Sequence, residues 1–491
     1  MEQLVEKLAI SAQKIEKVIQ AFCIHENDPD IDFSKVGNYN KAANCPIIVL
    51  RDGTLISFLD YGAFSALYEN PFYWITRDKS YLGTHSQTRG SFTEKFTDRT
   101  LRKVFPDQYV FRNVIFRLSA GDAVGEADVI LIYGYRAFIV QAKSKRLTLA
   151  SWAGDDIAIA NDFKKAVQEA YDQAVECVSH INNDVMAYIN DVPIDLKKFG
   201  EIREFYPICV TSENYPALAF QNSTSLQLQE AAKMYPPIVT DLFTLDVMSE
   251  MLETPFYFTD YLVKRAKASG RLHISHELVA LSWYIKKNLH VEDNEFVHVA
   301  DDYMVELDLA IAVRKMGIEG QATPEGQLTR FRGTPVGKLL DYINSSNRPD
   351  VHRLGEILLS MSGTAADALN TSIARIIKMT RADYGTHDIS LGLDGGGGIT
   401  IHCNEESRGN AEKLLNYHCE MRKYSEKADR WYGITLNIKG DPKFMIGLEF
   451  PWKMDPILES HAGPFKVRAV TKSLFGPRKI GRNDICPCGS G

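Results

Sequence analysis

A single hairpin in the first third of the sequence most constrains the fold, because both of its faces are apolar. Two β-rich runs, Val129–Tyr133 and Ala137–Val140, flank the dipeptide Gly134-Tyr135. A two-residue loop with glycine first is typical of a type II′ turn, which fixes the register of the two strands. Since successive side chains alternate between faces, apolar residues occupy both sides. We therefore predict that the hairpin lies inside a sheet covered on both faces.

Polar side chains gather at the open end of this hairpin. Counting back from the turn places Asp128 opposite Gln141 and Glu126 opposite Lys143, with all four on one face. Mg²⁺ prefers such oxygen ligands and needs only one or two carboxylates beside water and substrate phosphates. The ammonium could orient a water or stabilise charge on a phosphate. The alternative is the polar end of a hairpin at a wet sheet edge.

The spacing Asp128…Gln141-Ala142-Lys143 resembles the PD-(D/E)XK nuclease superfamily, in the variant where Gln replaces the second acid, as in Mrr-like enzymes. The lead-in Gly125-Glu126-Ala127-Asp128 is also similar to the nuclease-related NERD branch. The resemblance implies an α/β protein with a restriction-endonuclease-like α/β/α core.

The same resemblance implies a role for each polar residue of the site. Asp128 would bind Mg²⁺ or Mn²⁺, with Gln141 as a second ligand or as support. Lys143 would act on the water or on transition-state charge. Glu126 or Glu94 would supply an auxiliary acid, Glu94 from a helix that precedes the first core strand.

Glu94 also has a purely structural interpretation. Ser91 followed three residues later by Glu94 forms a capping box at the start of a helix that we expect to end near Phe105. Capping would explain the acid without catalysis, and both interpretations stay open.

Residues after the hairpin add two further candidates. The basic run Ser144-Lys145-Arg146 could touch phosphates, or could be a solvated loop. A helix is expected over 161–181, and its Gln173 would point towards the cleft if the resemblance holds.

The length of 491 residues predicts about three domains. We expect an N-terminal helix and hairpin region, a nuclease-like domain, a mostly helical region, an α+β domain and a basic tail, over 1–85, 86–260, 261–385, 386–465 and 466–491. The α+β domain offers no recognisable chemistry, and we interpret it as a recognition or interaction domain.

Composition narrows the class of protein. A net charge of −7 excludes a general nucleic-acid coat, so any DNA contact must come from local basic patches. Eight scattered cysteines favour a reduced, cytoplasmic protein over a disulfide framework. The first 22 residues predict an amphipathic helix and not a signal peptide, and no run is long enough to span a membrane.

The tail carries a second resemblance. Residues 481–491, with Cys486 and Cys488, are similar to the first half of the SEC-C zinc motif. A structural Zn²⁺ site needs four ligands, and the family's remaining pair is absent here. We expect either a truncated sequence, which is the favoured explanation, or completion by a protein partner.

Together these patterns predict a metal-dependent endonuclease that hydrolyses phosphodiester bonds in nucleic acid, with DNA the expected substrate, in bacterial defence or DNA processing. The alternative is a catalytically inactive module that keeps the nuclease-like fold and binds nucleic acid or protein. Replacement of an acid by Gln141 removes one negative charge from the metal site, which supports that alternative.

Overall fold

The computed structural model describes residues 2–25, 28, 44–59, 61–76, 78–118, 121–152, 155–213, 226–290, 296–346, 349–393 and 396–461. The basic tail, with Cys486 and Cys488, lies outside these residues, and so does the predicted half zinc motif. None of the helices in the described part is both long enough and apolar enough to cross a bilayer.

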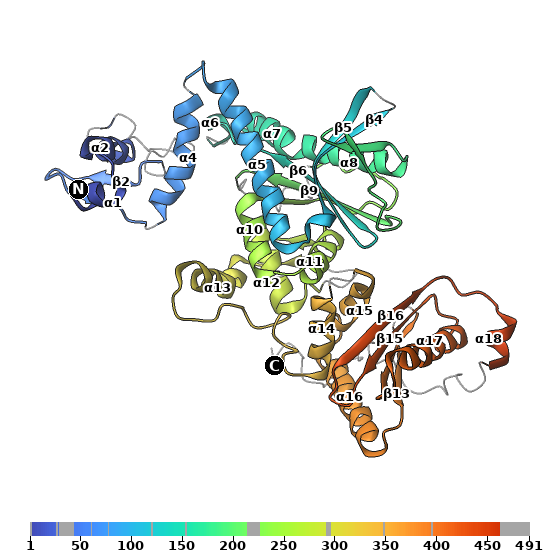
Figure 1. Cartoon of the computed structure of the whole chain (residues 1–491). Coiled ribbons are helices and arrows are strands. Elements are labelled where there is room, and N and C mark those ends of the chain that lie inside the picture. Colours follow the sequence, from blue (N-terminus) through green and yellow to red (C-terminus); the bar gives the residue numbers. More distant parts are fainter. Residues whose placement is uncertain are drawn as a thin grey trace.

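A seven-stranded mixed sheet forms the centre of residues 86–260 and makes this an α/β protein, as predicted (Figure 1). Its strand order is β10-β9-β6-β5-β4-β7-β8. The strands are β4 (Val110–Leu118), β5 (Asp122–Tyr133), β6 (Arg136–Lys143), β7 (Met186–Ile189), β8 (Val192–Ile194), β9 (Glu204–Thr211) and β10 (Ile238–Asp241). Strands β5 and β6 therefore lie in the interior of the sheet. The β7–β8 hairpin was not predicted.

The predicted hairpin register is confirmed. Tyr133 pairs with Arg136, and the ladder continues to Val129 opposite Val140. Gly134 has a positive φ of 67°, as the first loop residue of a type II′ turn requires. Both faces are buried in different apolar clusters, one through Leu131 and the other through Ile130 and their neighbours.

Helices cover the two faces of the sheet. The Leu131 face packs against α5 (Leu82–Val104), α10 (Leu242–Met251) and α11 (Pro255–Lys267). The Ile130 face packs against α8 (Glu169–Asn182), which continues a helical run formed by α7 (Asp156–Phe163) and a π-helical segment, η3 (Lys164–Gln168). The expected helix over 161–181 is therefore present but begins earlier.

Two expected boundaries near the site are wrong. Helix α5 begins at Leu82, so Ser91 lies in the middle of the helix and cannot be its N-cap. Strand β5 begins at Asp122, where a loop running to Gly125 was expected, because β4 pairs with this extension as well.

The mostly helical region is confirmed and contains one helix that was not predicted, α13. Its helices are α12 (Glu277–Lys287), α13 (Val305–Met316), α14 (Pro335–Ser345), α15 (Pro349–Leu359) and α16 (Gly363–Asp383). Within this region lie the short helix η4 (Asp301–Met304) and the paired strands β11 (Leu272–His273) and β12 (Val297–His298). Two other short helices lie in the large-sheet region: η2 (Asp107–Tyr109) between α5 and β4, and α6 (Leu149–Trp152) between β6 and α7. Helices α11, α12 and α13 share one apolar cluster with the large sheet.

The C-terminal described region is a four-stranded sheet carrying one long helix, as predicted. Its elements are β13 (His387–Gly392), β14 (Gly398–Cys403), α17 (Arg408–Ser425), β15 (Arg430–Leu436), β16 (Pro442–Glu449) and α18 (Pro456–His461). Apolar residues of β14 and β15 pack against α14, α15 and α16, which joins this sheet to the helical region.

The N-terminal region holds α1 (Glu2–Leu8), α2 (Ala12–Ala21), α4 (Gly62–Thr76) and a small sheet of β1 (Cys23–His25), β2 (Ile47–Val49) and β3 (Leu55–Ile56). The dipeptide Asp52-Gly53 between β2 and β3 predicts a two-residue type I′ turn. Only Gly53 has a positive φ, and its N–H donates to the Leu50 carbonyl, so the turn has one residue more than expected.

Candidate active site at the open end of the hairpin

The β5–β6 ladder ends just before the predicted polar cluster. Its last backbone pair is Val129 with Val140, so the direct pairing expected for Asp128 with Gln141 does not continue the ladder. Beyond this point β6 instead continues beside β9, where Gln141 pairs with Cys209 and Lys143 with Thr211. The two hairpin strands therefore separate where the candidate residues lie.

The Gln141 carboxamide fills the gap between the separating strands. Its Nε2 donates to the carbonyl of Glu126 at 2.8 Å, and the Asp128 N–H points to its Oε1 at 3.5 Å. The side chain is 2% exposed and lies beside Cys177 of α8. Because both ends of the carboxamide face β5 backbone, these contacts favour the supporting role over a direct metal-ligating one.

The Asp128 carboxylate lies in the same gap, where its Oδ2 accepts the N–H of Ala142 at 2.7 Å. Burial raises its pKa to about 6, against the lowering effect of that hydrogen bond. Glu94 and Glu126 raise the pKa further, whereas Lys143 lowers it. A half-buried carboxylate whose pKa is raised by desolvation and by neighbouring acids is stabilised when a cation binds beside it.

Lys143 extends from β6 towards α8. Its Nζ donates to Oε1 of Gln173 at 2.6 Å, which agrees with the expectation that Gln173 faces the cleft. Because a lysine beside a largely apolar sheet needs a partner, the opposed pairing of Glu126 with Lys143 predicts that the carboxylates hold this ammonium. That prediction is wrong, because no ion pair joins Lys143 to Asp128 or Glu126, all three of which are among the described residues.

The two auxiliary acids come from different elements. Glu94 lies in the interior of α5 and is half-buried, so the capping explanation for it no longer holds. Among the neighbouring acids, Glu94 raises the pKa of Asp128 the most. Glu126 lies on β5 and is exposed.

The glycine of the Gly125-Glu126-Ala127-Asp128 lead-in has a packing role. A Cβ at Gly125 would lie 2.7 Å from the His180 ring, which is too close for any side chain. The same ring contacts the Val124 carbonyl through Nε2 at 3.1 Å. Glycine therefore lets the end of α8 approach β5.

The described acids at the open end of the hairpin do not form a three-ligand metal cluster. Within the described ranges, no three His, Cys, Asp or Glu side chains converge with metal-binding geometry. The donor set at Asp128 nevertheless fits a hard divalent cation, which keeps several waters and can be held by one or two carboxylates plus substrate phosphate. Asp128 would hold such an ion, with Glu94 or Glu126 as second carboxylate.

The basic run after β6 does not form a free phosphate-binding surface. Arg146 is buried, pairs with Glu213 and donates to the carbonyl of Glu69 at 2.9 Å. Lys145 pairs with Asp162 at 2.9 Å. Both side chains thus stabilise the connection between β6 and α7.

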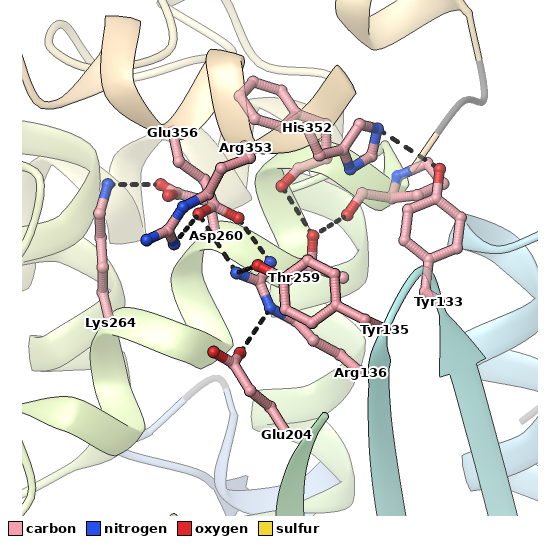
Figure 2. Close-up of polar contacts among 12 residues, drawn as sticks. Tyr133, Tyr135, Arg136, Glu204, Thr259, Asp260, Lys264, His352, Arg353 and Glu356 are labelled. Atoms are coloured by element: carbon pink, nitrogen blue, oxygen red, sulfur yellow. Dashed lines mark hydrogen bonds and ion pairs between the residues drawn. The ribbon is translucent and has the colours of Figure 1, made fainter. Parts of the chain in front are cut away.

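The opposite end of the hairpin carries a charge network that the sequence did not reveal. Arg136 is buried between Glu204, at 2.9 Å, and Glu356 of α15, at 2.5 Å (Figure 2). Arg353 also contacts Glu356, at 3.0 Å. The only local signal was a charged residue at the end of an apolar hairpin, and its partner on α15 is 220 positions away.

A second group that the sequence did not reveal lies in the C-terminal sheet. His402 Nε2 and His418 Nδ1 are 3.0 Å apart, and His418 Nε2 lies 3.6 Å from Asp388. Burial, followed by the charge of His418, lowers the pKa of His402 to about 4. A neutral ring pair of this kind is a structural hydrogen bond between β14 and α17.

Comparison with protein-family models, with curated proteins and with solved structures found no match to this chain.

Proposed function

We propose that the protein is a metal-dependent endonuclease of PD-(D/E)XK type, with a restriction-endonuclease-like core and its active site at the open end of the β5–β6 hairpin. The observation that carries the proposal is the Asp128 carboxylate, which is half-buried at the point of strand separation beside Glu94, Glu126 and Lys143, with its pKa raised to about 6. DNA is the proposed substrate and the cytoplasm the proposed location. Bacterial defence or DNA processing is the proposed role.

Each residue of the site has a distinct proposed task. A bound Mg²⁺ or Mn²⁺ would supply charge stabilisation at a phosphate and a more acidic water. Asp128 would hold the ion, assisted by Glu94 or Glu126. Gln141 bridges the gap between the two strands through its hydrogen bond to the Glu126 carbonyl.

Lys143 would orient the attacking water or stabilise charge on the phosphate. In the absence of substrate its ammonium is held by Gln173. A hydrogen bond to a neutral carboxamide is easier to exchange for a phosphate contact than a buried ion pair would be. The lysine is therefore held near the site and still available to substrate.

A non-catalytic module that binds nucleic acid or protein is the second candidate function. Two observations favour it: the Gln141 carboxamide is occupied by backbone groups, and no three-ligand metal cluster occurs in the part of the chain that the structure describes. In this case the fold would hold nucleic acid or protein without cleaving a phosphodiester bond.

Cleavage assays separate the two functions. Single- and double-stranded DNA and RNA would be incubated with the protein and Mg²⁺ or Mn²⁺, and with a chelator as the control. We expect metal-dependent cleavage that Asp128→Ala abolishes. Lys143→Ala should lower the rate by about a thousandfold, the loss typical of removing a transition-state charge contact.

Matched substitutions exclude general damage to the fold. Asp122→Ala removes an exposed carboxylate from the same strand, and Lys165→Ala removes an exposed ammonium from the neighbouring helical run. Both should cleave like the parent protein. Cleavage that persists in a folded Asp128→Ala protein would rule out this site, and absence of cleavage on every substrate would favour the binding module.

A further inference from the structure

A cationic cavity lies away from the candidate active site, where the large sheet's helices, the helical region and the C-terminal sheet meet. Its volume is about 740 Å³, within the range of small-molecule sites. Two carboxylates and six cationic side chains line it. The cationic side chains are Lys264, Lys267, Lys287, Arg330, Arg353 and Arg430.

Both carboxylates in the cavity wall are already paired. Asp260 accepts from Lys264 at 2.7 Å and from the Tyr284 hydroxyl at 2.8 Å. Glu356 is bound by Arg136 and Arg353, and Figure 2 shows these groups side by side. Neither acid is left to neutralise the remaining cations.

The remaining cations have no acidic partner in the described residues. Arg330 donates to the Met361 carbonyl at 2.8 Å, and Arg430 donates to the Gly396 carbonyl at 3.2 Å. Lys267 lies over the Tyr235 ring. No ion pair is formed by Lys267 or Lys287 within the described chain, so the cavity carries an excess of positive charge.

We propose that this cavity binds a nucleotide that carries two or three phosphates. Several separated cations require a ligand with several negative charges, and guanidinium groups match phosphate oxygens in two-point contacts. Ile357 and Leu393, both half-buried, also line the cavity and offer an apolar surface for a base. Binding of nucleic acid would instead favour a basic stripe along an open surface.

The position of the cavity predicts a second effect of the ligand. Its lining residues come from α11, α12, α15 and β15, which belong to segments far apart in the chain. Arg353 and Glu356 connect the cavity wall to Arg136 at the loop end of the hairpin. A bound nucleotide should therefore hold these segments together and raise the unfolding temperature of the whole protein.

Calorimetric titration of the full chain with ATP, ADP, AMP, adenosine and inorganic triphosphate tests the proposal. We expect saturable binding of ATP and ADP, at least tenfold weaker binding of AMP, and none of adenosine. Inorganic triphosphate should compete with ATP. Absence of saturable binding by ATP, ADP and inorganic triphosphate would overturn the proposal.

Variants locate the site. Lys267 and Lys287 are exposed on the cavity wall, so the double substitution Lys267→Ala, Lys287→Ala should leave the fold intact and weaken ATP binding at least tenfold. Lys164→Ala with Lys165→Ala removes two exposed ammonium groups outside the cavity and should change nothing. Equal ATP affinity in both double variants would overturn the proposal.

A DNA oligonucleotide serves as the competing class of ligand. Nucleotide binding that persists in the presence of the oligonucleotide supports the proposal. An oligonucleotide that displaces ATP, binds more tightly and depends on the same two lysines would overturn it and make the cavity part of a nucleic-acid surface.

Discussion

The two ends of the β5–β6 hairpin treat buried charge in opposite ways. At the loop end, Arg136 is almost fully buried, yet carboxylates on two sides neutralise it. At the open end, the Asp128 carboxylate receives one backbone N–H and has acids among its charged neighbours.

The difference between the two ends distinguishes a charge that holds the fold together from a charge that a ligand can still neutralise. A buried ion that is fully paired contributes to the connection between elements, and a ligand gains little by replacing its partners. A half-buried carboxylate beside other acids is costly to the fold and is retained where a ligand later stabilises it. Loss of the loop-end charges should therefore affect stability, whereas loss of the open-end charges should affect activity.

The largest effect is expected for Arg136→Ala. This change removes the cation between Glu204 and Glu356 and leaves the buried Glu356 carboxylate with Arg353 alone, which should lower the free energy of unfolding by about 3–5 kcal/mol. Chemical denaturation measures it. Arg203→Ala, which removes an exposed guanidinium, should cost less than about 0.5 kcal/mol. Equal losses in the two variants would remove the contrast between the hairpin ends.

The second-largest effect is expected at low pH, where protonation of Glu356 should lower the stability of the fold. Burial favours a raised pKa for Glu356, but the charge and hydrogen bonds of Arg136 outweigh it and lower the pKa from 4.5 to about 2. A lowered pKa contributes stability above pH 4.5 that is lost as the pH falls towards 2, about 3 kcal/mol at 1.36 kcal/mol per unit.

Unfolding measured at several pH values tests this loss. The difference in stability between the parent protein and Glu356→Gln should shrink as the pH falls from 4.5 to 2. A difference that stays constant through this window would show that Glu356 does not titrate there.

At the open end, the pH dependence of stability has the opposite sign. Because the Asp128 pKa is raised from 3.8 to about 6, its contribution to stability is present below pH 3.8 and is lost as the pH rises through 6. Asp128→Asn should therefore be more stable than the parent at pH 8, by about 3 kcal/mol at 1.36 kcal/mol per pH unit, and equally stable near pH 3.5. Denaturation at both pH values measures the difference, and a variant destabilised at pH 8 would contradict the assignment.

The smallest effect is expected for Gln173→Ala. This change removes the hydrogen bond to Lys143 at an accessible position, so stability should fall by less than about 1 kcal/mol. Glu176→Ala, at an exposed position on the same helix, is the matched control. A loss above about 2 kcal/mol in Gln173→Ala alone would mean that Lys143 is a structural anchor comparable to Arg136.

Local patterns predicted the hairpin well, because a glycine-led turn and period-two apolar residues act over a few positions. They failed for α5, where Ser91 and Glu94 imitate a helix start. Buried Thr93 and Thr97 pack this segment into the molecule, and tertiary packing overrides the weak local preference.

Contacts between residues that are far apart in the sequence could not be predicted from local patterns. Nothing near Arg136 in the sequence points to Glu356, which approaches only when α15 packs against the hairpin. The Gln141 carboxamide shows the same limit at the site: its place on β6 was predictable, but its bonds to β5 backbone depend on where the ladder ends.

The π-helical segment Lys164–Gln168 makes the site depend on the number of residues before it as well as on their identity. Each residue of a helix turns the chain by about 100°, and a π-helical turn accommodates an extra residue. Deleting one residue within this segment would restore a regular helix and leave the later residues facing as they do. Deleting one residue from the regular part of α8 before Gln173 would instead rotate everything after it by about 100°. Gln173 would then turn away from Lys143, and Cys177 would leave the sheet, although no side chain at the site had been replaced.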